Sequence, residues 1–187
     1  MTERFDRTIG RRAAVQVLYG SELLNTTADV VLESGTVPAE TELNDYGRGL
    51  LLGVAAHAVE IDRLISERSQ NWAIDRMPVV DRQLLRTTVY EMLYVDEVPV
   101  PVSINEAVEI AKDFGGDDSH RFINGVLGRI ARDIEQGLIG KGSAAVSAEE
   151  EASQPAEEAE VESDVEETVE STEAEPAATD EAVEQAE

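Results

Sequence analysis

Apolar residues along the chain recur with the spacing of α-helices. The clearest stripe runs from Tyr46 to Ile65, where apolar positions three and four residues apart fall on one helix face. A similar stripe begins at about Thr8 and ends at Leu24. No segment alternates in the manner of a half-buried strand hairpin, and no period of roughly 20–50 residues repeats. The pattern therefore predicts an all-α protein.

Boundary signals predict shorter helical segments between the long ones. A second helix follows Thr26 or Thr27 as its N-cap and ends at Gly35. Residues 71–72 open a short helical piece that ends at Pro78, because the residue before a proline disfavours helical backbone. Pro78 in turn suits the first turn of the next helix.

Three further signals define the C-terminal helices. Ser103 and Glu106 have the spacing of a capping box, which predicts a helix start at Ser103 and an end at Gly115. A last helix is capped by Asp118 or Ser119. The helix before Ser103 has a predicted buried stripe of Leu85, Thr88, Val89, Met92 and Val95. The total is six or seven helices.

Charge divides the chain into two parts. The 187 residues contain 40 acidic and 15 basic residues, for a net charge of −25. Residues 143–187 contain 17 of the acids, no basic residue, and no Leu, Ile, Met or aromatic residue. Such a segment cannot bury enough apolar surface to offset its conformational entropy. We therefore expect one folded domain over residues 1–142, followed by a disordered acidic tail over residues 143–187.

Composition removes several classes of function. The chain has no Cys and only two His, which excludes thiol nucleophiles, disulfides and Cys- or His-rich metal sites. No apolar run approaches the roughly 20 residues of a membrane span, so we expect a soluble cytoplasmic protein. The glycines of residues 47–53 follow no strand and predict close helix contact instead of nucleotide binding. His57 fits a core position better than a catalytic one. We expect neither enzyme activity nor a cofactor.

Two segments carry candidate binding chemistry. Arg4, Arg7 and Arg11 share a helix face, and residues 4–12 have a local charge of +3. This face is either merely solvated or a site for phosphate groups, which arginine binds well. The second segment is the glycine-rich stretch between Phe114 and Phe122, whose rings either stack on bases or belong to the core.

Several motifs together closely resemble the NusB family of transcription antitermination factors. The most specific is Phe114-Gly-Gly-Asp-Asp-Ser-His-Arg-Phe-Ile-Asn-Gly-Val-Leu127. Supporting motifs are Ala14-Val-Gln-Val-Leu-Tyr19, Asp81-Arg-Gln-Leu-Leu-Arg86, Val89-Tyr-Glu-Met-Leu93 and Ser103-Ile-Asn-Glu-Ala107. The resemblance extends from about Arg7 to Ile134. It implies two small helical bundles packed together.

The resemblance also implies a function and its residues. The family binds the box A element of ribosomal RNA transcripts together with the ribosomal protein NusE, within a transcribing RNA polymerase assembly. The RNA-binding positions it implies are Arg7, Arg11, Lys112, Phe114, Asp118, Arg121 and Phe122. The NusE-binding positions it implies are Tyr19, Asp75 and Asp81. The N-terminal basic run is sparser than in many members, which predicts weak RNA affinity without the partner.

Two other interpretations remain open from the sequence. A similar helical module forms the N-terminal part of an rRNA cytosine methyltransferase, but that enzyme needs a large α/β domain after the module. The other alternative is a purely protein-binding scaffold that contacts basic partners through its acidic surface.

Overall fold

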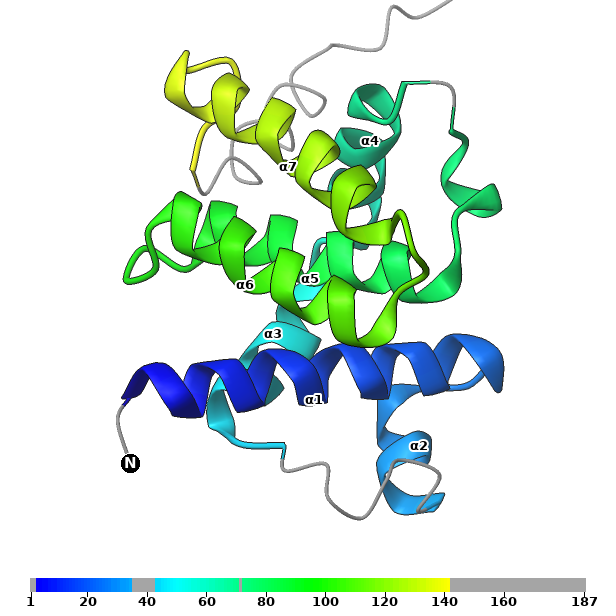
Figure 1. Ribbon diagram of the computed structural model, residues 1–187. Helices are drawn as coiled ribbons and strands as arrows, with labels where there is room; N and C mark the ends of the chain where they lie inside the picture. Colours follow the sequence, from blue (N-terminus) through cyan, green and yellow to red (C-terminus); the bar gives the residue numbers. More distant parts are fainter. Residues whose placement is uncertain (1–2, 35–42, 71, 142–187) are drawn as a thin grey trace, which may run out of the picture. The chain divides into compact units, whose positions relative to one another are not determined.

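The computed structural model describes residues 3–34, 43–70 and 72–141, all within one unit of the chain, Met1–Ser153. These residues form seven α-helices and a short 3₁₀ turn, with no strand among them (Figure 1). This confirms the all-α prediction. The predicted helix end at Gly35 and the acidic segment 143–187 lie outside the described residues.

Eight elements follow one another along the described part of the chain. They are α1 (Glu3–Leu23), α2 (Ala28–Ser34), α3 (Asp45–Ala56), α4 (Ala58–Arg68), the 3₁₀ turn η1 (Ile74–Arg76), α5 (Val79–Tyr94), α6 (Val100–Phe114) and α7 (Ser119–Glu135). Within the described ranges, no helix is both long enough and apolar enough to span a membrane.

The core consists of two apolar clusters, as expected for two packed bundles. The first joins α1, α2 and α3 through Ala14, Val17, Val31, Leu50 and Leu51. The second joins α4, α5, α6 and α7, and its largest fully buried side chains include Ile61, Leu85, Met92, Ile110, Ile123 and Leu127. Tyr90 packs against both clusters. The ring of this α5 residue therefore links the two bundles.

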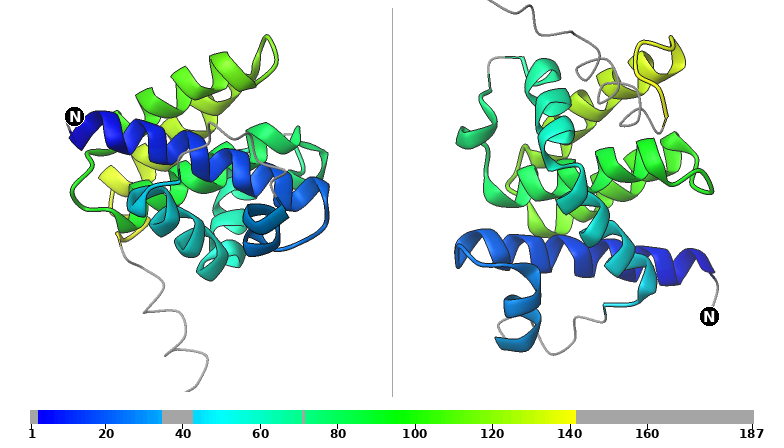
Figure 2. Two further views of the ribbon diagram at one scale, coloured as in Figure 1. Left: turned by 90° about the horizontal axis from the view of Figure 1, so that it is seen from below. Right: turned by 180° about the vertical axis from the view of Figure 1, so that it is seen from behind.

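Helix α5 is buried on nearly all sides, where the sequence predicted a single apolar stripe. It contacts α1, α3, α4, α6 and α7, and the view from below shows α1 lying across the later helices (Figure 2). Its polar residues Asp81, Arg82, Gln83 and Glu91 are buried along with the apolar ones. A periodicity rule treats such residues as solvent-facing, so it missed the enclosed position of this helix.

The glycines Gly10 and Gly47 bring α1 and α3 into close contact. A Cβ atom at Gly10 would lie 2.8 Å from the backbone nitrogen of Gly47, and one at Gly47 would lie 2.6 Å from the carbonyl oxygen of Gly10. Asn44 caps α3 by accepting from the Gly47 amide at 2.9 Å, and its Nδ2 donates to the Asp6 carbonyl at 2.6 Å. Of the glycines in residues 47–53, Gly47 is thus a packing position, as is Gly53 against the Tyr90 ring, whereas Gly49 has open space around it.

Several predicted boundaries were wrong. The first helix begins at Glu3, five residues before the predicted start at about Thr8, and the short helical piece predicted from residues 71–72 begins at Ile74. The stripe from Tyr46 to Ile65 is divided between α3 and α4 at His57, which leaves helical geometry at φ −114° and ψ 18°. The His57 ring is half-buried instead of lying in the core, and it stacks on Tyr94 with 4.1 Å between ring centroids. The two helices it separates can therefore each follow a different bundle.

Another wrong boundary is the capping box. Helix α6 begins at Val100 after Pro99, three residues before the predicted cap, because proline is well tolerated in a first helical turn. Ser103 consequently lies inside the helix. The Glu106 carboxylate does not cap the helix but accepts hydrogen bonds from α1.

Candidate RNA-binding surface

Arg11 lies at the centre of a buried ionic network. Its side chain is 6% exposed; its Nε donates to Glu91 of α5 at 2.8 Å and its Nη1 to Glu106 of α6 at 3.3 Å. Thr8 donates to Glu106 at 2.7 Å, and the Tyr46 hydroxyl donates to Glu91. A buried charge requires such partners. Arg11 therefore ties α1 to α5 and α6, and little of its side chain is exposed for contact with an RNA phosphate.

The phenol of Tyr46 is part of the same network. Its ring lies 5.5 Å from the Arg11 guanidinium carbon. Burial and the hydrogen bond to Glu91 raise the pKa of Tyr46 well above its usual value. Tyr46 therefore stays a neutral donor, so the network holds one guanidinium against two carboxylates.

Arg7 lies one turn earlier on α1 and remains half-exposed. It pairs with Glu3 and donates to the Glu97 carbonyl at 3.4 Å. Together with Arg4 it lines a pocket of about 420 Å³ between the start of α1 and the start of α6. Arg11 lines the same pocket, but only 6% of its side chain is exposed, against 24% for Arg7. Arg7 is thus the more accessible of the two to a ligand.

Arg12, which the sequence did not indicate as a site residue, joins α1 to the end of α6, just before the glycine-rich loop. It pairs with Asp113, and its guanidinium carbon lies 5.5 Å from the centroid of the Phe114 ring. The sequence signal was present in the basic run of residues 4–12. Arg12 does not share the face defined by Arg4, Arg7 and Arg11, because it lies about 100° further round the helix than Arg11.

The loop between α6 and α7 is fixed by Ser119. The Ser119 hydroxyl accepts from the Gly116 amide at 2.9 Å and donates to Asp81 of α5 at 3.0 Å. A Cβ atom at Gly115 would lie 2.5 Å from the Ser119 Cβ, so the turn packs tightly against the start of α7. Asp118 occupies the N-cap position without a side-chain capping bond. The loop therefore holds a defined conformation against α5.

Asp81 is buried, which corrects the expectation of an exposed partner-binding acid. Only 3% of the residue is accessible, and its Oδ1 has no hydrogen-bond partner among the described residues. Burial raises the pKa of Asp81 above its usual value, although the hydrogen bond from Ser119 opposes this effect. The carboxylate acts here as the anchor of the loop.

The two phenylalanines of the loop occupy different environments. Phe114 is 38% exposed at the end of α6. Phe122 is partly buried against the second core cluster, and its ring lies 6.0 Å from the half-exposed ring of Trp72. The sequence left open whether the two rings are exposed or belong to the core, and the answer differs between them. Phe114 lies at the surface, whereas Phe122 packs on the core on one side and has a ring neighbour at the surface.

Two exposed ion pairs flank this loop. Lys112 pairs with Glu109 at 2.6 Å, and Arg121 pairs with Asp118 at 3.1 Å. Exposed pairs of this kind contribute only about 0–1 kcal/mol. Either cation can exchange its carboxylate for a phosphate at little cost.

The expected partner-binding residues lie on three elements. Tyr19 is half-buried on α1, Asp75 is exposed on η1, and Asp81 is the buried loop anchor on α5. The position of η1 depends on Arg82, which the sequence did not single out: it donates to the Ile74 carbonyl at 2.6 Å and pairs with Glu22. Arg82 thus connects η1 to the C-terminal end of α1.

The residues of this surface suit the binding of a polyanion whose own ring systems are unstacked and accessible. It offers guanidinium groups, an ammonium group and accessible aromatic faces, which are the groups that contact phosphates and bases. No group of three or more His, Cys, Asp or Glu side chains in the described part of the chain could hold a metal ion. The fold and the surface define an all-helical binding protein of the kind that contacts nucleic acid.

The family assignment follows from the sequence match. The model of the NusB family matches residues 8–132, and the chain belongs to this family. The transcription antitermination protein NusB of Halalkalibacterium halodurans is 43% identical over 124 residues, which cover 66% of this chain and 92% of the relative. That of Nocardioides sp. is 41% identical over 126 residues, covering 67% and 93%.

Solved structures agree with this assignment. The structure of T. maritima NusB matches with a TM-score of 0.60 and 33% identity, covering 71% of this chain and 97% of that one. A chain in the crystal structure of antitermination factors NusB and NusE in complex with dsRNA matches with a TM-score of 0.57 and 25% identity, covering 70% and 98%.

Proposed function

We propose that the protein is a cytoplasmic transcription antitermination factor without catalytic activity. It binds box A RNA together with a NusE-type ribosomal protein and joins a transcribing RNA polymerase assembly. Relatives at 41–43% identity, matched over more than nine-tenths of their length, are transcription antitermination proteins. A structural neighbour is a complex of NusB and NusE with double-stranded RNA.

The observation that carries the RNA-binding part is the arrangement around Phe114. Its ring is accessible at the end of α6, with the Arg12 guanidinium 5.5 Å from its centroid. Aromatic rings beside guanidinium groups bind unstacked bases, because the ring stacks and the cation contacts the adjacent phosphate. Phe114 is the last residue of α6, and Ser119 holds the loop that follows it against α5, so the ring is positioned before RNA arrives.

Each candidate residue receives a role from its surroundings. We assign base stacking to Phe114 and Phe122, and phosphate contacts to Arg7, Arg12, Lys112 and Arg121. Asp118 holds Arg121 until RNA binds. Arg11 and Asp81 position these groups from inside the fold without touching RNA. Tyr19 and Asp75 remain the candidates for contact with the ribosomal protein.

A filter-binding assay tests the proposal. Labelled box A RNA is titrated with the protein alone and with an equimolar NusE-type protein, and an RNA of the same composition in scrambled order is the control. We expect weak binding alone, tighter binding with the partner, and preference for box A over the scrambled RNA. Partner binding with no RNA affinity in any combination would favour the protein-binding scaffold instead.

A further inference from the structure

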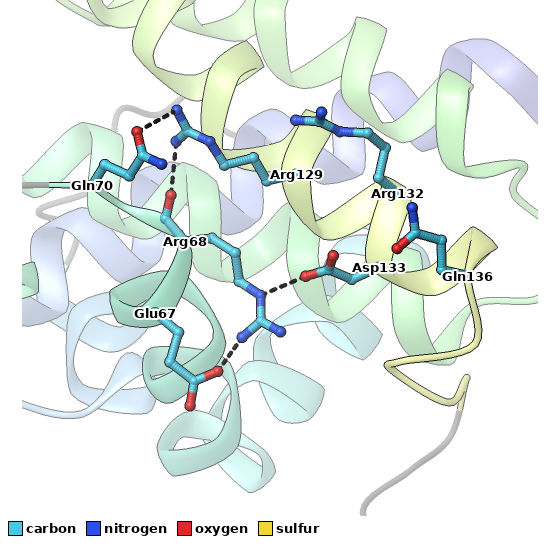
Figure 3. Close-up of a pocket in the computed structure, with 7 residues that line it drawn as sticks. All are labelled: Glu67, Arg68, Gln70, Arg129, Arg132, Asp133 and Gln136. Atoms are coloured by element: carbon cyan, nitrogen blue, oxygen red, sulfur yellow. Dashed lines mark hydrogen bonds and ion pairs between the residues drawn. The ribbon is translucent and has the colours of Figure 1, made fainter.

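A second basic site lies at the other end of α7. Glu67, Arg68 and Gln70, at the end of α4 and just after it, face Arg129, Arg132, Asp133 and Gln136 near the end of α7. These seven residues line a pocket of about 530 Å³, here called the arginine pocket (Figure 3). The surface described above does not include it.

The charges in the arginine pocket are unevenly compensated. Arg68 pairs with Asp133 at 2.9 Å and also with Glu67. Arg129 donates only to neutral groups, the Arg68 carbonyl at 2.8 Å and the Gln70 side chain at 3.3 Å. The two acids of the pocket are thus both engaged by one arginine.

Arg132 is less constrained than Arg129. Its Nε donates to the Gly128 carbonyl of its own helix at 3.1 Å. Neither Arg129 nor Arg132 has a carboxylate partner among the described residues, and their guanidinium groups lie on the side of the pocket away from the Arg68–Asp133 pair (Figure 3). Two guanidinium groups are therefore available for an anion.

The arginine pocket continues the aromatic part of the candidate surface. Phe122, Gly125, Arg129 and Arg132 follow one another at helical spacings of three and four residues, so they share one face of α7. The distance along the helix from Phe122 to Arg132 is about 15 Å. On the opposing chain segment, Gln70 of the pocket precedes Trp72, the ring neighbour of Phe122, by two residues.

We propose that the arginine pocket binds a backbone phosphate of the same RNA, extending its path from the Trp72–Phe122 pair along α7. This inference rests on the proposed function. Arginine forks bind phosphate oxygens in bidentate fashion, and Arg129 is already oriented by two hydrogen bonds. Continuity with the aromatic pair favours RNA over an acidic peptide, because an acidic peptide has no bases to stack on these rings. The 15 Å path corresponds to roughly four stacked nucleotides at about 3.4 Å each.

The test combines RNA length with arginine substitution. Box A RNA and versions extended by about four nucleotides at the 5′ end or the 3′ end are titrated in the presence of the NusE-type partner, over a salt series. The wild type should gain affinity from extension at one end only. R129Q combined with R132Q should lose that gain, by on the order of tenfold at low salt, and its log–log salt slope should be shallower by about 1 or more.

Two further variants keep the result interpretable. R132Q alone breaks no hydrogen bond between helices, so it should show part of the effect even if the double variant is less stable. R48Q is the matched control: Arg48 is an exposed arginine of α3, a helix without appreciable contact with α7. It should bind all three RNAs as the wild type does.

The outcomes separate this inference from the proposed function. If no RNA binds to the wild type with its partner, the proposed function fails. If box A binds but the arginine variants equal R48Q for every RNA and salt concentration, only the arginine pocket proposal fails. Tighter RNA binding by the variants would also overturn it, since the pocket would then hold a competing acidic segment.

Discussion

Arg11 of α1 donates from its Nε to Glu91 of α5 at 2.8 Å, and both side chains are almost fully enclosed. Glu106 of α6 completes the network. Arg11, which the sequence places on one helix face with Arg4 and Arg7, is therefore an internal link between three helices. Arg12 and Phe114, two candidate RNA-binding residues, lie on α1 and α6, two of the helices that this link joins.

Replacing Arg11 with Ala should destabilise the fold severely. The change leaves the Glu91 and Glu106 carboxylates buried without their cation, and breaking a buried ion pair typically costs about 3–5 kcal/mol. Urea unfolding followed by circular dichroism measures the loss. R7A is the control, since Arg7 is half-exposed and should change the unfolding free energy by less than about 1 kcal/mol. Similar stability of the two variants would contradict the assigned role of Arg11.

Replacing Gly47 with Ala should separate α1 from α3. The new Cβ would lie 2.6 Å from the Gly10 carbonyl oxygen, and relieving such an overlap requires a backbone shift that typically costs about 1–3 kcal/mol. The matched control is G49A on the same helix, where an added Cβ meets nothing within 4 Å. That variant should gain up to about 1 kcal/mol from helix propensity. Thermal unfolding of both variants checks the prediction, and equal melting temperatures would contradict it.

The two loop phenylalanines should respond differently to truncation. F114A should weaken box A binding by about 1–3 kcal/mol with little change in stability, because this ring is at the surface. F122A should weaken RNA binding and also lower the unfolding free energy, because its ring packs against the core and Trp72. Paired RNA titrations and urea melts distinguish these effects. L52A, at an exposed apolar position of α3, should change neither quantity. Unchanged RNA affinity of F114A would remove Phe114 from the site.

Replacing Asp81 with Asn should make stability less dependent on acid pH. Burial raises the pKa of Asp81 in the folded state, so the ionised carboxylate penalises folding at neutral pH. That penalty fades as the pH falls through the raised pKa and is gone below the ordinary carboxyl pKa. D81N should therefore exceed the wild type in stability near pH 7, and the difference should shrink on acidification.

The control for this pH effect is D118N, which alters an exposed acid of the loop that Asp81 anchors. It should change the unfolding free energy by less than about 1 kcal/mol. Because Asn keeps an oxygen that can accept from Ser119, D81N preserves the loop anchor. A D81N protein less stable than the wild type at pH 7 would show that the ionised carboxylate contributes favourably.

Most helices could be located from the sequence because the signals that define them are local. The apolar face of a stripe such as Tyr46 to Ile65 can be recognised from residues within a few helical turns, and Pro78 indicates where a helix begins. Such signals predicted the all-α fold and indicated that the Gly47 segment serves packing. They failed at His57 and Ser103, where the arrangement of neighbouring helices and prolines decides the boundary.

The sequence by itself determined the helical class, the family resemblance and the loop between Phe114 and Phe122. Only the tertiary structure decided which charges are available for binding. Arg11 and Arg12 are adjacent in the chain, yet their contacts differ. Arg11 contacts carboxylates 80 and 95 residues away inside the fold, whereas Arg12 contacts Phe114 at the surface of the fold. The physical reason is that a charge is neutralised by whichever group folding places beside it in a poorly solvated interior, and helical periodicity carries no information about partners so distant in sequence.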